Sequence, residues 1–193
     1  MGSISASGKT DQALVRDTLR NPDAFGGLVE RYEKMLRRYV TRLGCRNPED
    51  AEDVLQNIFL KIYVNLNEYD ERLKFSSWAY RLAHNETVSF FRKKKIRPSS
   101  VETEEELVLF DTISDTVDIL ESLNEKMDAE CVRAALEGMD EQYRDVLILK
   151  YLEEKSYDEI SDILKIPAGT VATRISRGKK KLRERMISKK MDL

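Results

Sequence analysis

Residues 156–186, SYDEISDILKIPAGTVATRISRGKKKLRERM, decide the fold of the C-terminal half of the chain. Ser156 is followed three residues later by Glu159, and this capping-box pattern predicts the start of a helix. The apolar residues of that helix keep helical spacing: Ile160, Ile163 and Leu164. Residues 165–169, KIPAG, contain a proline and a glycine, so they predict a break in the helix.

A second helix is expected to follow this break. Its apolar residues recur at i, i+4, i+7 and i+11, which places them on one buried stripe: Val171, Ile175, Gly178 and Leu182. The other faces carry polar and basic side chains: Thr170, Thr173, Arg174, Ser176, Arg177, Lys179 and Lys180. We interpret the two helices as a helix-turn-helix whose second helix enters the major groove of DNA. A helical hairpin with a solvated basic face is the alternative.

The composition favours a small helical protein. With 193 residues, of which 41% are hydrophobic, the chain can form one domain or two small ones. No run of alternating β-branched residues predicts a strand, whereas helical periodicity recurs along the chain. We therefore expect an all-α fold.

The few cysteines and histidines argue against metal and redox chemistry. Cys45 and Cys131 form no metal-binding or redox motif, and a single histidine argues against a zinc site or a histidine-based catalytic triad. No apolar run is long enough to span a bilayer, and the chain shows no secretory signal. We expect a cytoplasmic protein with no cofactor, no metal, no catalytic residue and no small-molecule substrate.

The charge of the chain is strongly segregated, although the net charge is only −2. Residues 165–190 hold ten basic residues and one acidic residue, whereas residues 101–130 hold eleven acidic residues and one basic residue. A second basic block occupies residues 92–97. Two basic surfaces separated by an acidic connector indicate a protein that contacts a polyanion at two places. For any single run of charge, a solvated face is the alternative.

Pro98-Ser99-Ser100 marks the predicted domain boundary. We expect two small helical domains joined by an acidic linker, with the helix-turn-helix in the C-terminal domain. The predicted segments are a flexible tail at 1–10, an N-terminal domain at 11–97, the acidic linker at 98–120 and a C-terminal domain at 121–193.

Four helices are expected before this boundary. The first spans Asp11 to about Arg20, and the second ends near Gly44. Asn47 is the predicted cap of the third helix, with Pro48 at its first position. One face of the third helix is apolar and predicted to be buried: Ala51, Val54, Leu55, Ile58, Phe59, Ile62, Tyr63 and Leu66. The opposite face carries Asp53, Gln56, Asn57, Leu60 and Lys61.

The fourth helix, predicted at Ser76–Lys95, combines two arcs. Its inward arc is apolar: Phe75, Trp78, Ala79, Leu82, Ala83 and Phe90. The other arc mixes polar, basic and aromatic residues: Tyr80, Arg81, His84, Asn85, Val88, Phe91 and Arg92. Aromatic residues interleaved with arginine and amide side chains suit unpaired nucleic acid, because bases stack on the rings. The alternative is that Tyr80, Val88 and Phe91 face a neighbouring helix.

Three segments resemble bacterial sigma factors of the extracytoplasmic function (ECF) group within the sigma-70 family. Residues 47–61, NPEDAEDVLQNIFLK, resemble the helix with which sigma factors bind core RNA polymerase. Residues 74–85, KFSSWAYRLAHN, are similar to their promoter-opening helix. Residues 139–147, MDEQYRDVL, together with the helix-turn-helix, resemble their last domain. The resemblance runs from about residue 11 to residue 182.

The resemblance implies three sets of contact residues. Against the clamp helices of the polymerase β′ subunit it places Asp53, Gln56, Asn57 and Leu60, with Asn57 where relatives often carry an acidic residue. For the −10 element it implies Asn67, Tyr69, Lys74, Ser76, Ser77, Trp78, Tyr80, Arg81, Asn85 and Arg92. For the −35 element it implies Thr170, Ala172, Thr173, Arg174, Ser176, Arg177 and Lys180, with Ala172 where many relatives carry lysine or arginine.

The resemblance also implies a function and its partners. A protein of this kind directs promoter-specific transcription initiation by binding core RNA polymerase, through its β′ and β subunits, and promoter DNA. An anti-sigma factor is a further expected partner, and the acidic linker would enter the basic channels of the polymerase. A stand-alone helix-turn-helix regulator is the alternative, but it would not explain Gln56, Trp78 and Asn85. An enzyme is disfavoured by the single histidine and the lack of phosphate-binding glycine loops.

Overall fold

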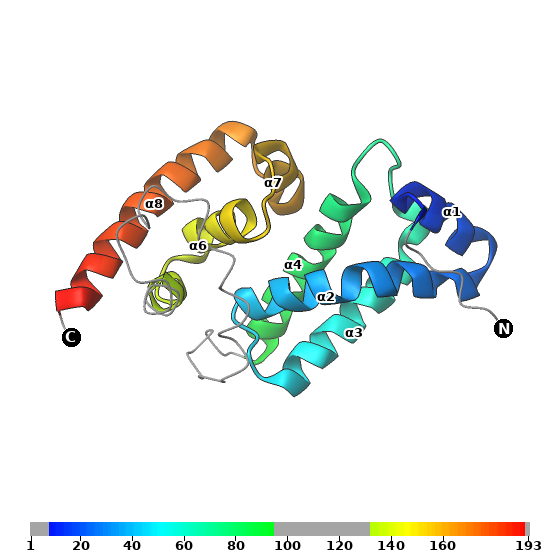
Figure 1. Cartoon of the computed structure of the whole chain (residues 1–193), viewed down its shortest axis with the longest axis horizontal. Helices are drawn as coiled ribbons and strands as arrows, with labels where there is room; N and C mark the ends of the chain where they lie inside the picture. Colours follow the sequence, from blue (N-terminus) through cyan, green and yellow to red (C-terminus); the bar gives the residue numbers. More distant parts are fainter. Residues whose placement is uncertain (1–7, 95–131, 192–193) are drawn as a thin grey trace. The chain divides into compact units, whose positions relative to one another are not determined.

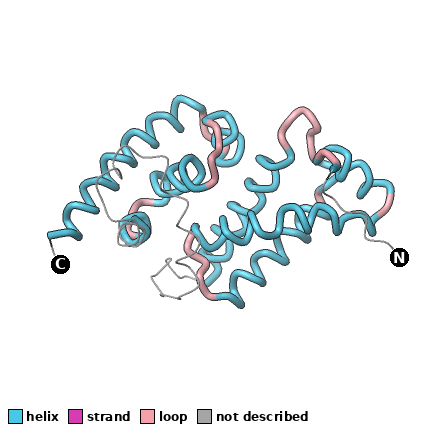
Figure 2. Tube along the Cα trace, in the orientation of Figure 1, coloured by secondary structure: helices cyan, strands magenta, loops and turns pink. Residues whose placement is uncertain are grey.

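The computed structural model of the chain describes residues 8–94 and 132–191, with side chains as far as residue 187. Figure 2 shows helices joined by short loops in these residues, with no strand among them, so the predicted all-α class is confirmed for this part of the chain. The chain divides into two compact units, Met1–Ile96 and Arg97–Leu193. The predicted acidic linker at 98–120 lies outside the described residues, as do residues 1–7 and Cys131.

The first unit is built from four α-helices and two short 3-10 turns (Figure 1). In chain order these are α1 (Asp11–Arg20), η2 (Pro22–Phe25), α2 (Gly26–Arg42), α3 (Pro48–Val64), η3 (Leu66–Glu68) and α4 (Phe75–Lys94). Helices α2, α3 and α4 contact one another, and α1 contacts α2, η2 and η3. The last three α-helices therefore form a bundle, with α1 against its side.

Local capping explains where these helices begin and end. The Thr10 side chain accepts a hydrogen bond from the backbone N–H of Ala13 (3.2 Å), and Asn47 accepts one from Asp50 (2.9 Å). Pro48 occupies the first turn of α3, as predicted. Helix α2 ends at Arg42, and Gly44 follows two residues later with a φ of 114°, in the left-handed region that favours glycine.

Four aromatic rings pack together where the η3–α4 loop enters α4. This aromatic cluster comprises Tyr32, Tyr69, Phe75 and Trp78, and the centroids of its contacting rings lie between 5.2 and 5.6 Å apart. All four side chains are buried. Large aromatic side chains contribute strongly to a core, both through their buried area and through edge-to-face contacts. The cluster consequently fixes both ends of the η3–α4 loop.

The described part of the second unit is also helical. Residues 132–137 are helical, and α6 (Glu141–Leu147) continues into a π-helical turn, η6 (Ile148–Leu152). Helices α7 (Tyr157–Leu164) and α8 (Ala168–Met191) complete it, and α6 and α7 both contact α8. The predicted capping box is confirmed: Ser156 and Glu159 exchange side-chain and backbone hydrogen bonds of 2.9 and 3.2 Å.

The turn between α7 and α8 is shorter than predicted. The break spans residues 165–167, and Gly169 lies in the first turn of α8. The residue with left-handed backbone is Lys165, with φ of 54°, and not the glycine. The Pro167 carbonyl accepts the first bonds of α8, from Thr170 (2.8 Å) and Val171 (3.0 Å), and Ser161 Oγ donates to the Ile166 carbonyl (2.6 Å). These bonds hold Lys165 in a conformation that costs a non-glycine residue about 1–2 kcal/mol.

Gly178 allows α8 to cross α6 closely. A Cβ atom at this position would lie 3.2 Å from Leu147 Cδ1 and 3.3 Å from its Cγ. We predict that Gly178→Val lowers the free energy of unfolding of the second unit by about 1–3 kcal/mol, because the valine methyls have no room. The matched control is Gly169→Val, since no atom lies within 4 Å of a Cβ there.

Urea unfolding followed by far-UV circular dichroism would measure this difference. The fluorescence of Trp78, the one tryptophan of the sequence, reports the first unit and should not change. Equal stability of the two valine variants would show that the close crossing is not a packing constraint.

Candidate functional site

Helix α3 presents a continuous exposed face opposite its buried stripe. Asp53, Gln56, Asn57 and Leu60 are all exposed, whereas Val54, Leu55 and Ile58 are buried. The Asn57 amide donates to the Asp53 carbonyl (2.8 Å), so its side chain lies along the helix. These four residues therefore form one accessible surface, which we call the α3 face.

An apolar patch extends the α3 face beyond the predicted residues. Leu60 is 60% exposed, Tyr63 is 41% exposed and Val64 is 64% exposed. Tyr63 was expected in the buried stripe, but it is exposed even though its ring packs against that of Phe25, at 5.1 Å between centroids. The last turns of α3, FLKIYV, carry more apolar residues than one helix face can bury. Exposed apolar patches of this kind mark interaction surfaces.

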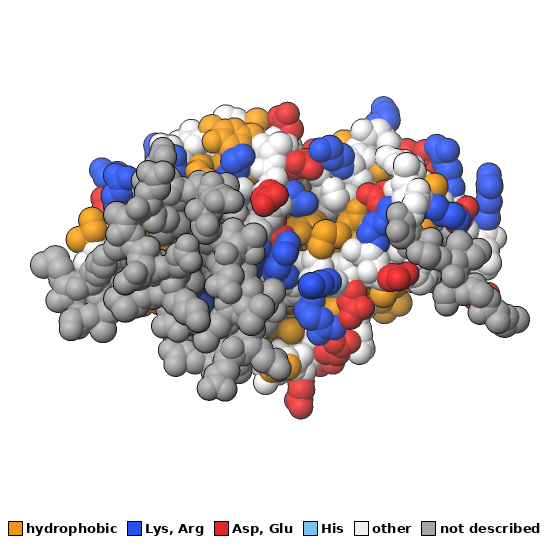
Figure 3. Space-filling view, viewed as in Figure 1, with side chains coloured by type: hydrophobic (Ala, Val, Ile, Leu, Met, Phe, Trp, Pro, Cys, Tyr) orange, Lys and Arg blue, Asp and Glu red, His pale blue; other side chains and the backbone are white. Residues whose placement is uncertain are grey.

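The residues assigned to the −10 element lie in η3, in the η3–α4 loop and in α4, and they differ in exposure. The exposed ones are Asn67, Lys74, Asn85 and Arg92, and the half-buried ones are Ser76 and Arg81. The buried ones are Tyr69, Ser77, Trp78 and Tyr80. Figure 3 shows basic and acidic side chains intermixed on the visible face of the first unit, so no uniform basic patch marks a DNA surface there.

The stacking surface expected at Tyr80 is not exposed. This side chain is only 1% exposed, and its ring centroid lies 4.9 Å from that of Tyr39. Tyr80 therefore faces a neighbouring helix, which was the alternative interpretation. Tyr69 and Trp78 belong to the aromatic cluster and are equally closed to a base. The reason is that both α2 and α3 contact α4, so more than one arc of this helix is buried.

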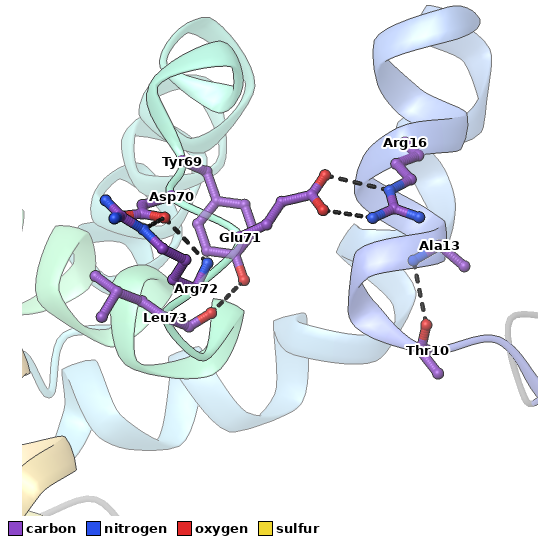
Figure 4. Close-up of polar contacts among 8 residues, drawn as sticks. All are labelled: Thr10, Ala13, Arg16, Tyr69, Asp70, Glu71, Arg72 and Leu73. Atoms are coloured by element: carbon purple, nitrogen blue, oxygen red, sulfur yellow. Dashed lines mark hydrogen bonds and ion pairs between the residues drawn. The ribbon is translucent and has the colours of Figure 1, made fainter.

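The η3–α4 loop is a preorganised turn (Figure 4). The backbone N–H of Leu73 donates to the Asp70 carbonyl (2.9 Å), which closes a β-turn. The Asp70 carboxylate accepts from the backbone N–H of Arg72 (3.0 Å) and from its Nε (2.9 Å). These hydrogen bonds lower the pKa of Asp70 to about 2, with the side-chain bond from Arg72 as the main cause. The Tyr69 hydroxyl donates to the Leu73 carbonyl (2.6 Å) and ties the turn to the core.

A buried carboxylate joins α3 to α4 next to the exposed Asn85. Glu86 is 7% exposed and forms an ion pair with Lys61 of α3. Arg37 of α2 also reaches α3, where it pairs with Glu52 (2.7 Å) and lowers the pKa of that carboxyl. His84 lies one residue before Asn85, with its Nδ1 3.2 Å from the Tyr39 hydroxyl. These contacts join α2, α3 and α4 to one another, and they therefore fix the positions of the exposed side chains of α3 and α4 relative to each other.

Helix α8 turns its predicted buried stripe toward α6 and α7. Val171, Ile175 and Gly178 are buried, and Leu182 is half-buried. The opposite side holds the residues assigned to the −35 element. Thr173, Ser176, Arg177 and Lys180 are exposed, and Thr170, Ala172 and Arg174 are half-buried. Lys181 differs from its neighbours because its Nζ lies over the Tyr143 ring, 5.2 Å from the centroid.

Within residues 8–94 and 132–191, no group of three or more histidine, cysteine or acidic residues could hold a metal ion. No helix in these ranges is long and apolar enough to cross a membrane. Cys45 is a free, buried thiol, and burial raises its pKa to about 12. It is therefore an uncharged core residue and not a nucleophile at neutral pH.

Both units match known protein families. Residues 28–96 match the family described as "Sigma-70 region 2", and residues 129–182 match "Sigma-70, region 4". The ECF RNA polymerase sigma factor SigW of Bacillus subtilis is 36% identical over 174 residues, which cover 85% of this chain and 89% of SigW. The ECF RNA polymerase sigma-E factor of Escherichia coli K12 is 30% identical over 175 residues, covering 88% and 91% of the two chains.

Two solved structures share the fold. The structure of CnrH in complex with the cytosolic domain of CnrY superposes with a TM-score of 0.68 at 21% identity, covering 92% of this chain and 97% of CnrH. The sigma factor RpoE of Bartonella quintana, in complex with the anti-sigma factor NepR, gives 0.60 at 20% identity, covering 84% and 96%.

This chain belongs to the ECF group of sigma factors in the sigma-70 family. It is an RNA polymerase sigma factor, that is, a transcription initiation factor that binds core polymerase and promoter DNA. The relatives match along nearly the whole chain, so the interpretation as a stand-alone regulator is set aside.

Burial makes Tyr80 a residue of the core and not of a DNA-stacking surface. We predict that Tyr80→Ala lowers the free energy of unfolding of the first unit by about 3–5 kcal/mol, as aromatic-to-alanine changes in cores do. Arg92→Ala, at an exposed position of the same helix, should change it by less than about 0.5 kcal/mol. Urea titrations read by Trp78 fluorescence give both values. A Tyr80→Ala protein of unchanged stability would contradict this assignment.

Proposed function

We propose that the two units recognise different elements of the promoter. The first unit binds core polymerase through the α3 face and holds extruded −10 bases at the η3–α4 loop and Asn85. The second unit binds the −35 element with α8. The observation that supports this division most directly is the exposure of the α3 face opposite the buried side chains of Val54, Leu55 and Ile58. The domain limits that we propose are 11–97, 98–120 and 121–193.

At the −10 element, the exposed residues are the proposed contacts and the buried ones are their scaffold. The Asn85 amide can both donate and accept, so it can bond the edge of an extruded base. Lys74 and Arg92 are exposed cations within reach of a backbone that passes along α4. Unstacking one base costs a few kcal/mol, which contacts in a preformed loop can offset without ATP. Tyr69, Ser77, Trp78 and Tyr80 keep the loop and α4 in place.

At the −35 element, the N-terminal half of α8 is the proposed base-contacting segment. Arg174 and Arg177 can donate to guanine, and Thr170 and Thr173 can bond bases or phosphates. The half-buried methyl group of Ala172 suits an apolar contact with a thymine methyl group. Lys179 and Lys180 are exposed farther along the helix, where side chains reach the DNA backbone.

The sigma factor is proposed to have no catalytic activity of its own and to work in the cytoplasm, where polymerase and promoters are. An anti-sigma factor is a proposed regulator. Two solved structures of the same fold are described as complexes with such a protein or with the cytosolic domain of a partner. The apolar patch at Leu60, Tyr63 and Val64 gives the chain a surface that such a partner could cover.

Binding to core polymerase tests the α3 face. We predict that Asp53→Ala with Gln56→Ala weakens the affinity for core RNA polymerase about tenfold, a typical loss for interface truncations of 1–2 kcal/mol. The free energy of unfolding should stay the same, because both side chains are exposed. Glu30→Ala, which removes an exposed carboxylate from α2, is the control. Fluorescence anisotropy of labelled sigma factor gives the affinities, and wild-type affinity of the double variant would remove α3 from the interface.

A panel of promoters tests α8. The reference is a promoter that the wild-type holoenzyme selects from a randomised DNA library, together with its single-base −35 variants. We predict that Arg174→Ala loses about 1–3 kcal/mol at one base position and tolerates substitutions there. Lys180→Ala should weaken all variants alike and reduce the salt slope of binding by about one. Measurements at two salt concentrations separate the two effects. Uniform weakening by Arg174→Ala would mean that α8 is placed differently in the groove.

A further inference from the structure

Helix α1, which precedes the segment that matches sigma-70 region 2, contacts the η3–α4 loop. Arg16 of α1 makes two parallel bonds to Glu71 at the tip of the loop, Nε to Oε1 at 3.2 Å and Nη2 to Oε2 at 2.5 Å (Figure 4). The two residues are 55 positions apart, and Arg16 precedes the segment 28–96 that matches sigma-70 region 2. Paired bonds between a guanidinium and a carboxylate fix orientation as well as distance. Helix α1 also contacts η3, which leads into the loop.

Helix α1 is itself firmly attached to the bundle. Leu14 and Val15 are buried, and the Asp11 carboxylate accepts hydrogen bonds from the Tyr32 hydroxyl (2.6 Å) and from Arg31 (2.7 Å). Burial, together with the bond to Asp11, raises the pKa of Tyr32, so its hydroxyl remains a donor. Tyr32 belongs to the same aromatic cluster as Tyr69 and Phe75. The loop is therefore held at its tip by α1 and at both ends by the cluster.

The Arg16–Glu71 ion pair also neutralises a negative charge at the tip of the loop. The stretch 67–74 contains three acidic residues, Glu68, Asp70 and Glu71. Asp70 is neutralised inside the turn by Arg72, and Glu71 is neutralised by Arg16. The hydrogen bond from Arg16 lowers the pKa of Glu71, so both partners are charged at neutral pH. An unpaired carboxylate here would repel DNA phosphates, because charges interact over about 10 Å at ordinary salt.

We propose that Arg16 is a positioning residue for promoter opening, which acts through Glu71 to hold the η3–α4 loop in the conformation that accepts an extruded −10 base. The inference rests on the proposed role of this loop at the −10 element. The side chains of Arg16 and Glu71 are 60% and 43% exposed, so the pair adds little to folding. Its contribution lies in the order and the charge of the loop that meets DNA.

Opening of the selected promoter by reconstituted holoenzyme tests the proposal. The readout is the fluorescence of 2-aminopurine placed in the −10 element, which rises when the base unstacks. We expect Arg16→Gln and Glu71→Gln each to reduce opening about two- to fivefold, the effect expected of one exposed ion pair. The double variant should be no worse than either single variant, because both remove the same interaction. Affinity for core polymerase should be unchanged in all three.

The Glu71→Gln variant shows whether Arg16 positions the loop or contacts DNA directly. If Arg16 bound a phosphate itself, Glu71→Gln would free its guanidinium and increase opening, whereas Arg16→Gln would decrease it. Opposite effects of the two single variants would overturn the proposal, as would fold-reductions that multiply in the double variant. The exchanged pair, Arg16→Glu with Glu71→Arg, should restore opening to within about twofold of wild type, since the interaction is re-formed in reverse.

Two further variants keep the outcomes distinguishable. Asp17→Asn breaks another ion pair of α1, with Lys9 at 2.6 Å, that does not reach the loop, and it should leave opening unchanged. Asn85→Ala tests the proposed −10 site without touching α1. If Asn85→Ala opens DNA normally, the proposed site at α4 fails. If Asn85→Ala loses opening while Arg16→Gln and Glu71→Gln match wild type, only the positioning role of Arg16 is refuted.

Discussion

The packing of the aromatic cluster against the start of α4 is the constraint on which the first unit depends. The cluster joins three elements, because Tyr32 lies in α2, Tyr69 directly follows η3, and Phe75 and Trp78 lie in α4. Because the two ends of the η3–α4 loop are buried together, the loop between them is short, turned and exposed at its tip. A flexible segment would lose conformational entropy on capturing a base, whereas this one is already ordered.

Buried and exposed faces are separated in the same way in α3 and α8. In α3 and α8 a buried stripe faces the unit while the opposite face stays open to a partner. In α8 the stripe approaches Leu147 closely because position 178 has no side chain. Helix α4 is different, since two neighbours cover it and only Asn85 and the basic C-terminal residues emerge. Few side chains of α4 are therefore available for the proposed DNA contact.

Local signals made much of this fold predictable from the sequence. The caps at Asn47 and Ser156 depend on residues within one turn, so their patterns suffice. Helical periodicity identified the exposed α3 face, but it placed Tyr63 in the buried stripe and could not assign Tyr80, because periodicity does not reveal how many neighbours cover a helix. The left-handed Lys165 was missed because bonds around the turn, and not the residue type, set its backbone. The Arg16–Glu71 contact joins residues 55 positions apart and has no local signature.

Two separate surfaces of this chain are proposed to contact two promoter elements while a third binds polymerase. The most direct measurement is sequencing of transcription start sites made by core polymerase and this sigma factor on a randomised template library. We predict two blocks of preferred sequence upstream of each start, separated by a constant spacer, and no such blocks with core polymerase alone. A single block, bound equally well without polymerase, would contradict it and would indicate a stand-alone helix-turn-helix protein.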